Sequence, residues 1–278
     1  MSFKNYLLSK SNSYNYYKSN YTKLNKENEK VNGELKKCRE DNRLLLESID
    51  DVISSGIDRY CPICNKKIPF FTPIYGRKHA FCPSCKSLER TRLLFYYINS
   101  NYNIFNLKEN KKLLHFAPEK ALFKIFDNLN NLDYWPVDIN PKNNIRKQVD
   151  MCDIPFEDNS FDFIISCHVL EHIPEDKKAM SELYRVIKPN SQGGIVFLMV
   201  PIFRELNETF ENPEYNTDEL RTKYFGQKDH VRKYSTDFND RLESVGFDVT
   251  CYDPVKLDKE INERYGFLDK DIIFICKK

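Results

Sequence analysis

The sequence predicts an α/β fold: a mostly parallel sheet with helices on both faces, preceded by a small four-cysteine ribbon and a long N-terminal helix. From about residue 110 onward, short apolar runs that suit strands alternate with helical patterns, and this alternation is typical of parallel sheets covered on both faces. Two CxxC pairs come before that region, and a heptad pattern comes before the pairs. We therefore expect three parts, at residues 1–56, 57–100 and 101–278.

Composition excludes several classes of protein. The 278 residues, 41% of them hydrophobic, suffice for one main domain with small appendages. The net charge of +2, from 43 basic and 41 acidic residues, gives no overall attraction to nucleic acid or to an anionic membrane. The N-terminus lacks the apolar run of a signal peptide. The longest apolar run, residues 195–203, is shorter than the roughly 20 residues that span a bilayer. These features predict a cytoplasmic protein with reduced cysteines and no membrane partner.

Residues 1–56 are polar but keep a regular seam, which predicts a parallel homodimeric coiled coil. The spacing of the seam residues alternates between three and four, as at the a and d positions of a heptad. The a positions are Tyr21, Asn28, Leu35, Asn42 and Ile49, and the d positions are Leu24, Val31, Cys38, Leu45 and Val52. Asn at an a position favours two parallel strands in register, because the two amides satisfy each other. Glu34 at g would then meet Arg39 at e of the partner helix. A single amphipathic helix on the globular body is the alternative.

Four cysteines in two CxxC pairs predict a structural zinc site. Cys61 and Cys64 are separated from Cys82 and Cys85 by the 17 residues 65–81, which suits two knuckles that give four thiolates to one tetrahedral ion. So short a segment has little core of its own, so metal binding would supply much of its folding free energy. A redox pair is the main alternative, and His79 is an alternative ligand. Zinc knuckles in some proteins contact RNA, which leaves an RNA role open at this point.

The remaining elements follow from apolar periodicity. Residues 87–99 predict a linking helix with Leu93, Leu94 and Ile98 toward the core and with Glu89, Arg90 and Arg92 toward solvent. Strands are predicted at 112–116, 134–137, 145–149, 161–166, 195–200, 247–252 and 272–276, and helices at 120–129, 176–187 and 236–245. No clear helix separates the last two strands. Residues 201–233 form a long polar excursion, and loops of this length are often lids or binding elements.

The stretch from Val149 to Pro174, VDMCDIPFEDNSFDFIISCHVLEHIP, carries the most specific signal. It contains four segments in order: an acidic strand end, a Pro-Phe turn, an Asn-Ser-Phe-Asp strand start and a His-Val-Leu-Glu-His loop. In this order they resemble the middle of class I S-adenosylmethionine-dependent methyltransferases of the small-molecule type (type 11-like). The resemblance covers about residues 110–278. It implies a Rossmann-like seven-stranded sheet with a reversed last strand, S-adenosylmethionine as the cofactor, and a small-molecule or glycan acceptor.

The resemblance also implies a set of cofactor-binding residues. The first turn of the family is rich in glycine, whereas this chain has Ala117, Glu119 and Ala121 at those positions. Because glycine lets the backbone approach a ligand closely, this departure bears on cofactor affinity. Glu119 would instead meet the ammonium group of the cofactor. The backbone at His168 would lie near its methionine end.

Two acidic strand ends match the adenosine-binding acids of the family. Asp138 matches the acid that holds the ribose hydroxyls, because a carboxylate accepts two hydrogen bonds at once. Asp150 matches the acid that accepts from the adenine amino group, with Met151 against the ring. Asp153 competes with Asp150 for that role. The alternative for either acid is a helix cap or a solvated turn.

The loop with His168, Glu171 and His172 supplies the candidate catalytic groups. It also reads HxxEH, which occurs on a helix as a zinc site in some metalloproteases. Here the motif follows a strand directly and Pro174 ends it, so no long helix displays both imidazoles. For a hydroxyl acceptor, an imidazole with a pKa near neutrality is a suitable base, and we expect His172, His168 or Glu171 to face the acceptor. The alternative is that the histidines only pack the crevice.

The end of the polar excursion supplies candidate acceptor-binding residues. His230, Arg232 and Tyr234 are predicted to line the acceptor pocket, and a solvated basic turn is the alternative. Two other functions remain open beside the methyltransferase. One is a binding or scaffold protein whose methyltransferase-like domain is weakened at its first turn. The other is an RNA methyltransferase guided by the ribbon, which the balanced charge does not favour.

Overall fold

A computed structural model describes residues 3–74, 76–102, 104–140 and 144–278. The chain divides into two compact units. The smaller unit contains the N-terminal residues up to Gly56 together with Thr72–Lys78, and the larger one contains Ile57–Phe71 and His79–Lys278. The cysteine ribbon therefore belongs mostly to the larger unit.

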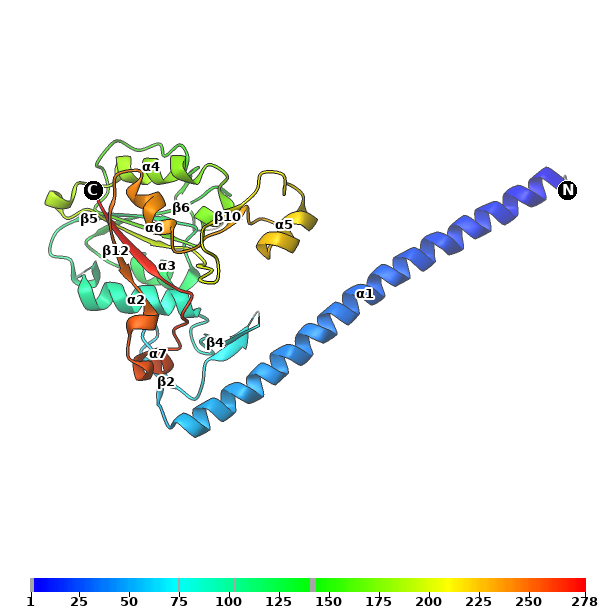
Figure 1. Ribbon diagram of the computed structural model, residues 1–278, viewed down its shortest axis with the longest axis horizontal. Coiled ribbons are helices and arrows are strands. Elements are labelled where there is room, and N and C mark those ends of the chain that lie inside the picture. The colour runs from blue at the N-terminus through cyan, green and yellow to red at the C-terminus, as the bar shows by residue number, and fades with distance from the viewer. Residues whose placement is uncertain (1–2, 75, 103, 141–143) are drawn as a thin grey trace. The chain divides into compact units, whose positions relative to one another are not determined.

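A seven-stranded sheet forms the centre of the larger unit (Figure 1). The strands in spatial order are β12 (Asp248–Tyr252), β13 (Ile273–Lys277), β9 (Ile195–Met199), β8 (Phe163–Cys167), β5 (Lys111–Phe116), β6 (Leu132–Asp138) and β7 (Lys147–Gln148). The strands from β5 to β9 pair in parallel, whereas β13 is antiparallel to both β9 and β12. The predicted mostly parallel α/β sheet with a reversed last strand is confirmed.

Side chains alternate between two hydrophobic cores along each central strand. Leu113, Ile165 and Phe197 face one core, and the neighbouring Leu114, Ile164 and Val196 face the other, because successive side chains of a strand point to opposite faces. Helices α2 (Glu89–Asn101) and α3 (Lys120–Phe126) cover the first face. Helices α4 (Asp176–Val186) and α6 (Phe238–Glu243) cover the second. Both faces of the sheet are thus buried, as its continuous apolar strands require.

Helix α2 differs from the prediction in the direction of two charged side chains. Glu89 and Arg92 are fully buried rather than solvent-facing, because the helix packs against the ribbon as well as the sheet. The five guanidinium N–H groups of Arg92 donate to five backbone carbonyls, those of His79, Ala80, Ser87, Tyr265 and Gly266. The guanidinium carbon also lies 3.7 Å from the centre of the Phe71 ring. A buried cation with every donor satisfied holds these segments together.

Two helices were absent from the prediction. Helix α7 (Lys259–Tyr265) lies between the last two strands, where the Asp258 side chain accepts from the N–H of Glu260 and Gly266 ends the helix. Helix α5 (Asp218–Phe225) lies within the polar excursion, which is closed by the antiparallel pair of β10 (Phe210–Glu211) and β11 (Arg232–Lys233). Both helices span only about two turns, too few for a clear apolar period.

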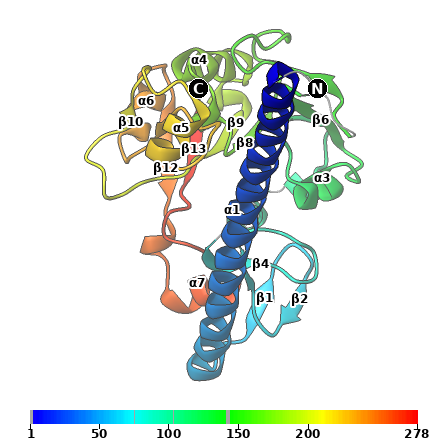
Figure 2. The ribbon, with the colours of Figure 1, turned by 90° about the vertical axis from the view of Figure 1, so that its right-hand side faces the viewer.

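The ribbon begins with an antiparallel pair, β1 (Arg59–Cys61) and β2 (Lys66–Ile68). A second pair follows, β3 (Thr72–Ile74) and β4 (Arg77–Phe81). Helix α7 lies beside β1 (Figure 2), where the Tyr60 and Tyr265 rings meet edge to face at 6.1 Å. The ribbon and the C-terminal part of the chain therefore pack against each other.

The smaller unit is dominated by α1 (Phe3–Ser55), a single helix of 53 residues. This confirms the predicted N-terminal helix. Its last turns pack on β3 with Leu44 and Ser48 buried, and Lys78 lies 2.6 Å from Glu47. Farther from this contact, apolar side chains of the predicted seam are exposed: Tyr21 69%, Leu24 60%, Val31 59% and Leu35 47%. Among the described helices, α1 included, none combines the length and apolar character needed to cross a membrane.

Candidate active site

A cavity of about 530 Å³ opens at the carboxyl ends of the parallel strands. Strand β5 lies between β6 and β8, so the chain order reverses there, and open α/β sheets bind ligands at such a point. The cavity is lined by Phe116, Ala117, Asp138, Ile139, Val149, Asp150, Met151, Cys152, Asp153, Val169, His172, Ile173, Pro174, Glu175 and Lys178. It therefore collects residues from four strand ends and from the start of α4.

The two acids expected to hold adenosine both line this cavity. Asp138 ends β6, and its Oδ1 accepts from the N–H of Asn140 at 2.9 Å. Asp150 follows β7, and its Oδ1 accepts from the N–H of Cys152 at 2.8 Å. These local hydrogen bonds fix both carboxylates in turns. Met151 directly follows Asp150 in the sequence and is 3% exposed. Asp153 lines the same cavity, so position alone does not choose between it and Asp150.

The first turn keeps the shape of a glycine-rich turn without glycine. Ala117 lines the cavity with φ of +44°, a left-handed conformation that costs an L-residue roughly 1–2 kcal/mol relative to glycine. Its N–H donates to the carbonyl of Val137 at 2.8 Å, which extends the β5–β6 pairing by one residue. The backbone at Ala117 therefore comes close to the cavity, at some cost in backbone strain.

Glu119 is not among the residues that line the cavity. Its Oε2 lies 3.1 Å from Nε2 of the fully buried His115, whose Nδ1 lies 3.0 Å from the Tyr134 hydroxyl. Burial opposes ionisation of Glu119, but the hydrogen bond and charge of His115 outweigh it, so the pKa of Glu119 falls below its usual value. The pair supports the turn from inside the domain. A contact of Glu119 with a cofactor ammonium stays a prediction.

The loop after β8 brings its three candidate groups into different surroundings. Leu170–His172 forms one 3-10 turn rather than an α-helix, as expected from Pro174. His172 lines the cavity, whereas His168 and Glu171 do not. Glu171 is 1% exposed, and its Oε1 lies 3.2 Å from Nδ1 of His168. Burial disfavours the Glu171 carboxylate, but His168 outweighs this and lowers its pKa.

His230, Arg232 and Tyr234 lie beside this loop and are all buried. The His230 ring meets the His172 ring edge to face at 4.7 Å, and burial lowers the pKa of His230, which favours its neutral form. These three side chains do not line the cavity at the strand ends. Arg232 lines a second cavity of about 230 Å³, which shares Pro174 with the first. Their part in acceptor binding stays a prediction.

Arg232 and Tyr234 also brace the loop that carries His172. Arg232 donates to the carbonyls of Leu170, Ile173 and Pro174 and, at 2.8 Å, to Glu211. Tyr234 donates to Asp176 at 2.8 Å, and Arg241 joins Asp176 to Glu211. Hydrogen bonds to backbone carbonyls fix the path of the loop. Both side chains can therefore position the cavity wall without touching a ligand.

Several lining residues carry no sequence signal. Ile139, Val169 and Ile173 are ordinary apolar residues, and Glu175 and Lys178 belong to the start of α4. Only the position of that helix start, directly after a strand end and a loop, indicates that its first turn faces the crevice.

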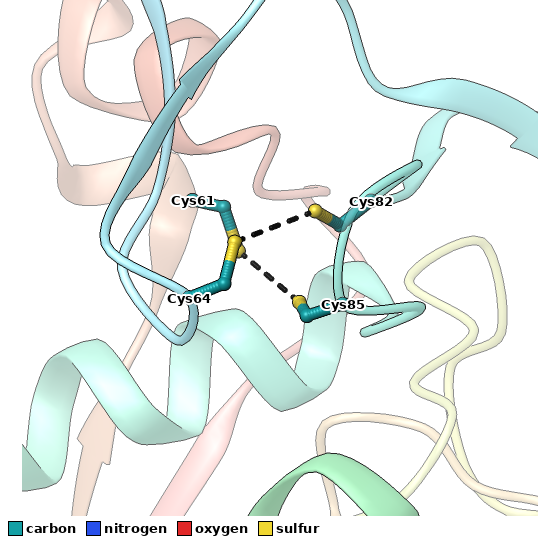
Figure 3. A group of neighbouring side chains, drawn as sticks. All are labelled: Cys61, Cys64, Cys82 and Cys85. Carbon is teal, nitrogen blue, oxygen red and sulfur yellow. Dashed lines mark hydrogen bonds between the residues drawn. The ribbon is translucent and has the colours of Figure 1, made fainter.

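The four cysteines converge in the ribbon (Figure 3). The Sγ atoms of all four lie within 4.8 Å of one another. Cys61 and Cys85 are 3.6 Å apart, and Cys64 and Cys82 are 3.9 Å apart. A tetrahedral zinc ion with Zn–S bonds of roughly 2.3 Å needs sulfurs about 3.8 Å apart. Ser87 Oγ lies 3.1 Å from the Cys85 sulfur. The donor set and its spacing fit zinc.

Comparisons with known proteins agree with these features. A family model described as a methyltransferase domain matches residues 118–197. A ubiquinone/menaquinone biosynthesis C-methyltransferase of Idiomarina loihiensis is 30% identical over 115 residues, which cover 38% of this chain and 46% of that protein. A demethylmenaquinone methyltransferase of Lactobacillus johnsonii is 28% identical over 112 residues, 40% of each chain. An S-adenosylmethionine dependent methyltransferase structure from Mesorhizobium loti aligns at a TM-score of 0.47 and 11% identity, over 66% of this chain and 97% of that one. The chain spans less than half the length of these two curated relatives.

Proposed function

Since the chain carries a class I S-adenosylmethionine-dependent methyltransferase domain, we propose that the protein transfers a methyl group from S-adenosylmethionine to a small-molecule acceptor. One observation carries this proposal: Asp138 and Asp150 come from neighbouring strand ends and line one cavity with Met151. Two acids that face one cavity suit the ribose and the base of a nucleoside, because each accepts hydrogen bonds that the nucleoside can donate. The volume of about 530 Å³ suits a small-molecule site.

The residues of this chain have distinct proposed roles toward the cofactor. Asp138 holds the ribose hydroxyls, Asp150 accepts from the adenine amino group, and Met151 covers the ring. The backbone at Ala117, which lines the same cavity, would adjoin the remainder of the cofactor. Bound S-adenosylmethionine supplies an activated methyl group on a sulfonium. The chain then contributes mainly by holding the cofactor and the acceptor in line and by excluding water.

Acceptor binding is proposed for the side of the cavity formed by the loop of His172. His172 is the candidate base there, since it lines the cavity and an imidazole exchanges protons near neutral pH. Its Nδ1 lies 3.2 Å from the carbonyl oxygen of Asp229, and a hydrogen bond to that oxygen fixes the tautomer with Nε2 unprotonated. A sugar or another hydroxyl-bearing metabolite fits this arrangement. The net charge of +2 does not favour RNA.

Methyl transfer can be tested without knowing the acceptor. Extract from the host is incubated with the full chain and isotopically labelled S-adenosylmethionine, and labelled small molecules are separated by mass spectrometry. We expect one labelled product class with the wild-type chain and loss of that product with Asp138→Ala. Label only in RNA, or no label above the level with Asp138→Ala, would contradict the proposal.

Two further features belong to the same proposal. Cys61, Cys64, Cys82 and Cys85 hold a structural zinc ion that stabilises the ribbon and does no chemistry. The exposed apolar seam of α1 pairs with that of a second copy in a parallel coiled coil, because Tyr21, Leu24, Val31 and Leu35 are 47–69% exposed in one chain. Light scattering on a peptide of residues 1–56 tests the dimer. None of the nine cysteines forms a disulfide, which fits a reducing, cytoplasmic compartment.

A further inference from the structure

Three side chains beside the cavity have the chemistry of a second metal centre. One ligand atom each of Glu171, His172 and His230 lies within 4.8 Å of the others. Bonds from a transition-metal ion to nitrogen or oxygen ligands are about 2.0–2.2 Å long. Ligand atoms that share one ion therefore lie closer together than 4.8 Å, and small rotations of the three side chains would bring them to that spacing. The cluster is separate from the four-cysteine site and shares no residue with it.

Several polar atoms of this cluster are buried without a hydrogen-bond partner in the described part of the chain, which indicates that a bound group would satisfy them. Glu171 is 1% exposed and His230 is 5% exposed. Neither carboxylate oxygen of Glu171 has a well-formed hydrogen bond among the described residues, although His168 lies within ion-pair distance. Nδ1 of His230 is likewise buried without a hydrogen-bond partner among those residues. A buried carboxylate left so poorly satisfied costs free energy unless a cation or a strong donor completes it.

The pair of His115 and Glu119 provides a contrast. In this pair, both ring nitrogens have partners, Tyr134 on one side and Glu119 on the other. Oε1 of Glu119 also lacks a hydrogen-bond partner among the described residues, but no third ligating side chain among them joins this pair. The cluster at Glu171 differs because a third ligating side chain joins it, which is a feature of a metal-binding site.

Hydrogen bonds to backbone carbonyls hold the parts of this cluster in place. The N–H of Val231 donates to the carbonyl of Glu171 at 3.0 Å, which ties the chain beside His230 to the loop of His172. Nδ1 of His172 lies 3.2 Å from the carbonyl oxygen of Asp229. Metal-bound histidines usually donate their second N–H to such an acceptor, and this leaves Nε2 for the ion.

From this geometry we infer that Glu171, His172 and His230 bind a divalent transition-metal ion at the edge of the cavity. Two imidazoles and one carboxylate suit zinc, manganese, cobalt or iron(II) rather than magnesium, which prefers an all-oxygen shell. Three protein ligands leave an open position, as in catalytic rather than structural sites. His172 also lines the cavity, so the open position lies within reach of a molecule bound there.

This inference deepens the proposed function and rests on it for the role of the ion. A metal ion at the acceptor end would bind an oxygen of the acceptor and orient it. The acceptor class is therefore a molecule with a hydroxyl or carboxylate oxygen that can bind a metal. In that case His172 serves as a ligand of the ion, and the role of a free base passes to another group or to water.

Metal content tests the inference independently of any activity. The full chain, with zinc in the four-cysteine site, is washed with a mild chelator and titrated with Co²⁺. The bound metals are counted by mass spectrometry and followed by visible absorption. We expect one Co²⁺ per chain in addition to one Zn²⁺, without the intense bands of cobalt–thiolate bonds. Glu171→Gln and His230→Ala should weaken Co²⁺ binding by about 100-fold or more.

Matched controls separate this result from misfolding and from the proposed function. Glu119→Gln changes the other buried glutamate of a His–Glu pair and should leave Co²⁺ binding intact. His172→Gln changes the most exposed of the three side chains. This variant should therefore fail to bind Co²⁺ while its free energy of unfolding stays that of the wild type. No Co²⁺ uptake by the wild-type chain, or equal uptake by Glu171→Gln, would overturn the inference.

Titration of the same samples with S-adenosylhomocysteine reports on the cofactor site alone. Binding of that ligand without Co²⁺ uptake would therefore refute the metal site and keep the methyltransferase.

Discussion

Nη2 of Arg92 lies 2.9 Å from the carbonyl oxygen of Gly266, 174 positions later in the chain. The same nitrogen donates to His79 in the ribbon at 2.8 Å. One side chain therefore joins the ribbon, helix α2 and the end of α7. The ribbon packs as part of the larger unit, so we expect changes in the ribbon to alter the stability of the cofactor domain.

Replacement of Gly266 by alanine should destabilise the larger unit by about 2–4 kcal/mol. Its φ is +63°, and an added Cβ would lie 2.6 Å from the Phe71 ring and 2.8 Å from Nη2 of Arg92. Gly226→Ala is the matched control, because Gly226 has φ of +89° but open space around a Cβ. We expect it to cost only about 1–2 kcal/mol, from backbone strain. Denaturant unfolding of both variants measures the difference, and equal losses would contradict the close packing.

Removal of zinc should lower the melting temperature of the whole larger unit. Structural zinc contributes folding free energy directly, and a loss of about 3 kcal/mol corresponds to roughly 10 °C in a unit of this size. A thiol-compatible chelator with a colorimetric zinc assay, followed by calorimetry, measures both quantities. Cys82→Ser should reproduce the loss, whereas Cys251→Ser, at an exposed cysteine, should retain zinc. A separate low-temperature transition for the ribbon alone would contradict the role of Arg92.

Asp271→Asn should stabilise the protein at neutral pH. Burial, followed by the charge of Glu89, raises the pKa of Asp271 from 3.8 to about 6. A raised folded pKa means that the folded state binds the proton more tightly. The contribution of Asp271 to stability is therefore greatest below pH 3.8 and falls as the pH rises to about 6. The deficit above that range is up to about 3 kcal/mol.

The measurement for Asp271 is the free energy of unfolding from pH 4 to 8. Asp271→Asn should flatten the decline between pH 4 and 6, because an amide does not titrate there. Asp269→Asn, at an exposed position two residues earlier, should leave the curve unchanged. A variant that is less stable than the wild type at pH 7 would show that the Asp271 carboxylate is satisfied in its ionised form.

Ala117→Gly should strengthen binding of S-adenosylhomocysteine by about fivefold, equivalent to roughly 1 kcal/mol. The φ of +44° at Ala117 suits glycine, which also allows closer approach of the backbone to a ligand. Ala121→Gly, within helix α3, is the control. It should lose about 1 kcal/mol of stability from helix propensity and gain no affinity. Calorimetric titration of both variants tests this, and unchanged or weaker binding by Ala117→Gly would contradict it.

The sheet could be predicted from sequence because its evidence is local. Leu113 and Leu114, or Ile164 and Ile165, are adjacent apolar residues that face opposite cores, and such runs indicate a sheet buried on both faces. The two CxxC pairs and the acid after β6 are also local signals. The convergence of Asp138 and Asp150 on one cavity followed from the parallel strand order.

Other features depend on contacts between distant segments. Arg92 was expected to face solvent because its helix has charged residues on that side, but the ribbon and the end of α7 cover it. The buried place of Arg232 depends on Glu211 and on the carbonyls of a loop about 60 residues earlier. Likewise, His230 meets Glu171 and His172 only in the folded chain. No period or motif in the sequence encodes such pairings.

Titration with S-adenosylhomocysteine tests the central claim most directly. We predict that the wild-type chain binds one equivalent in calorimetry. Asp138→Ala and Asp150→Ala should each weaken binding by about 10-fold to 100-fold, as expected for loss of a hydrogen bond to a charged group. Asp127→Ala, at an exposed position after α3, should bind as the wild type does. No detectable binding by the wild-type chain, or binding unaffected by both cavity variants, would contradict the proposal that these two acids hold the adenosine of the cofactor.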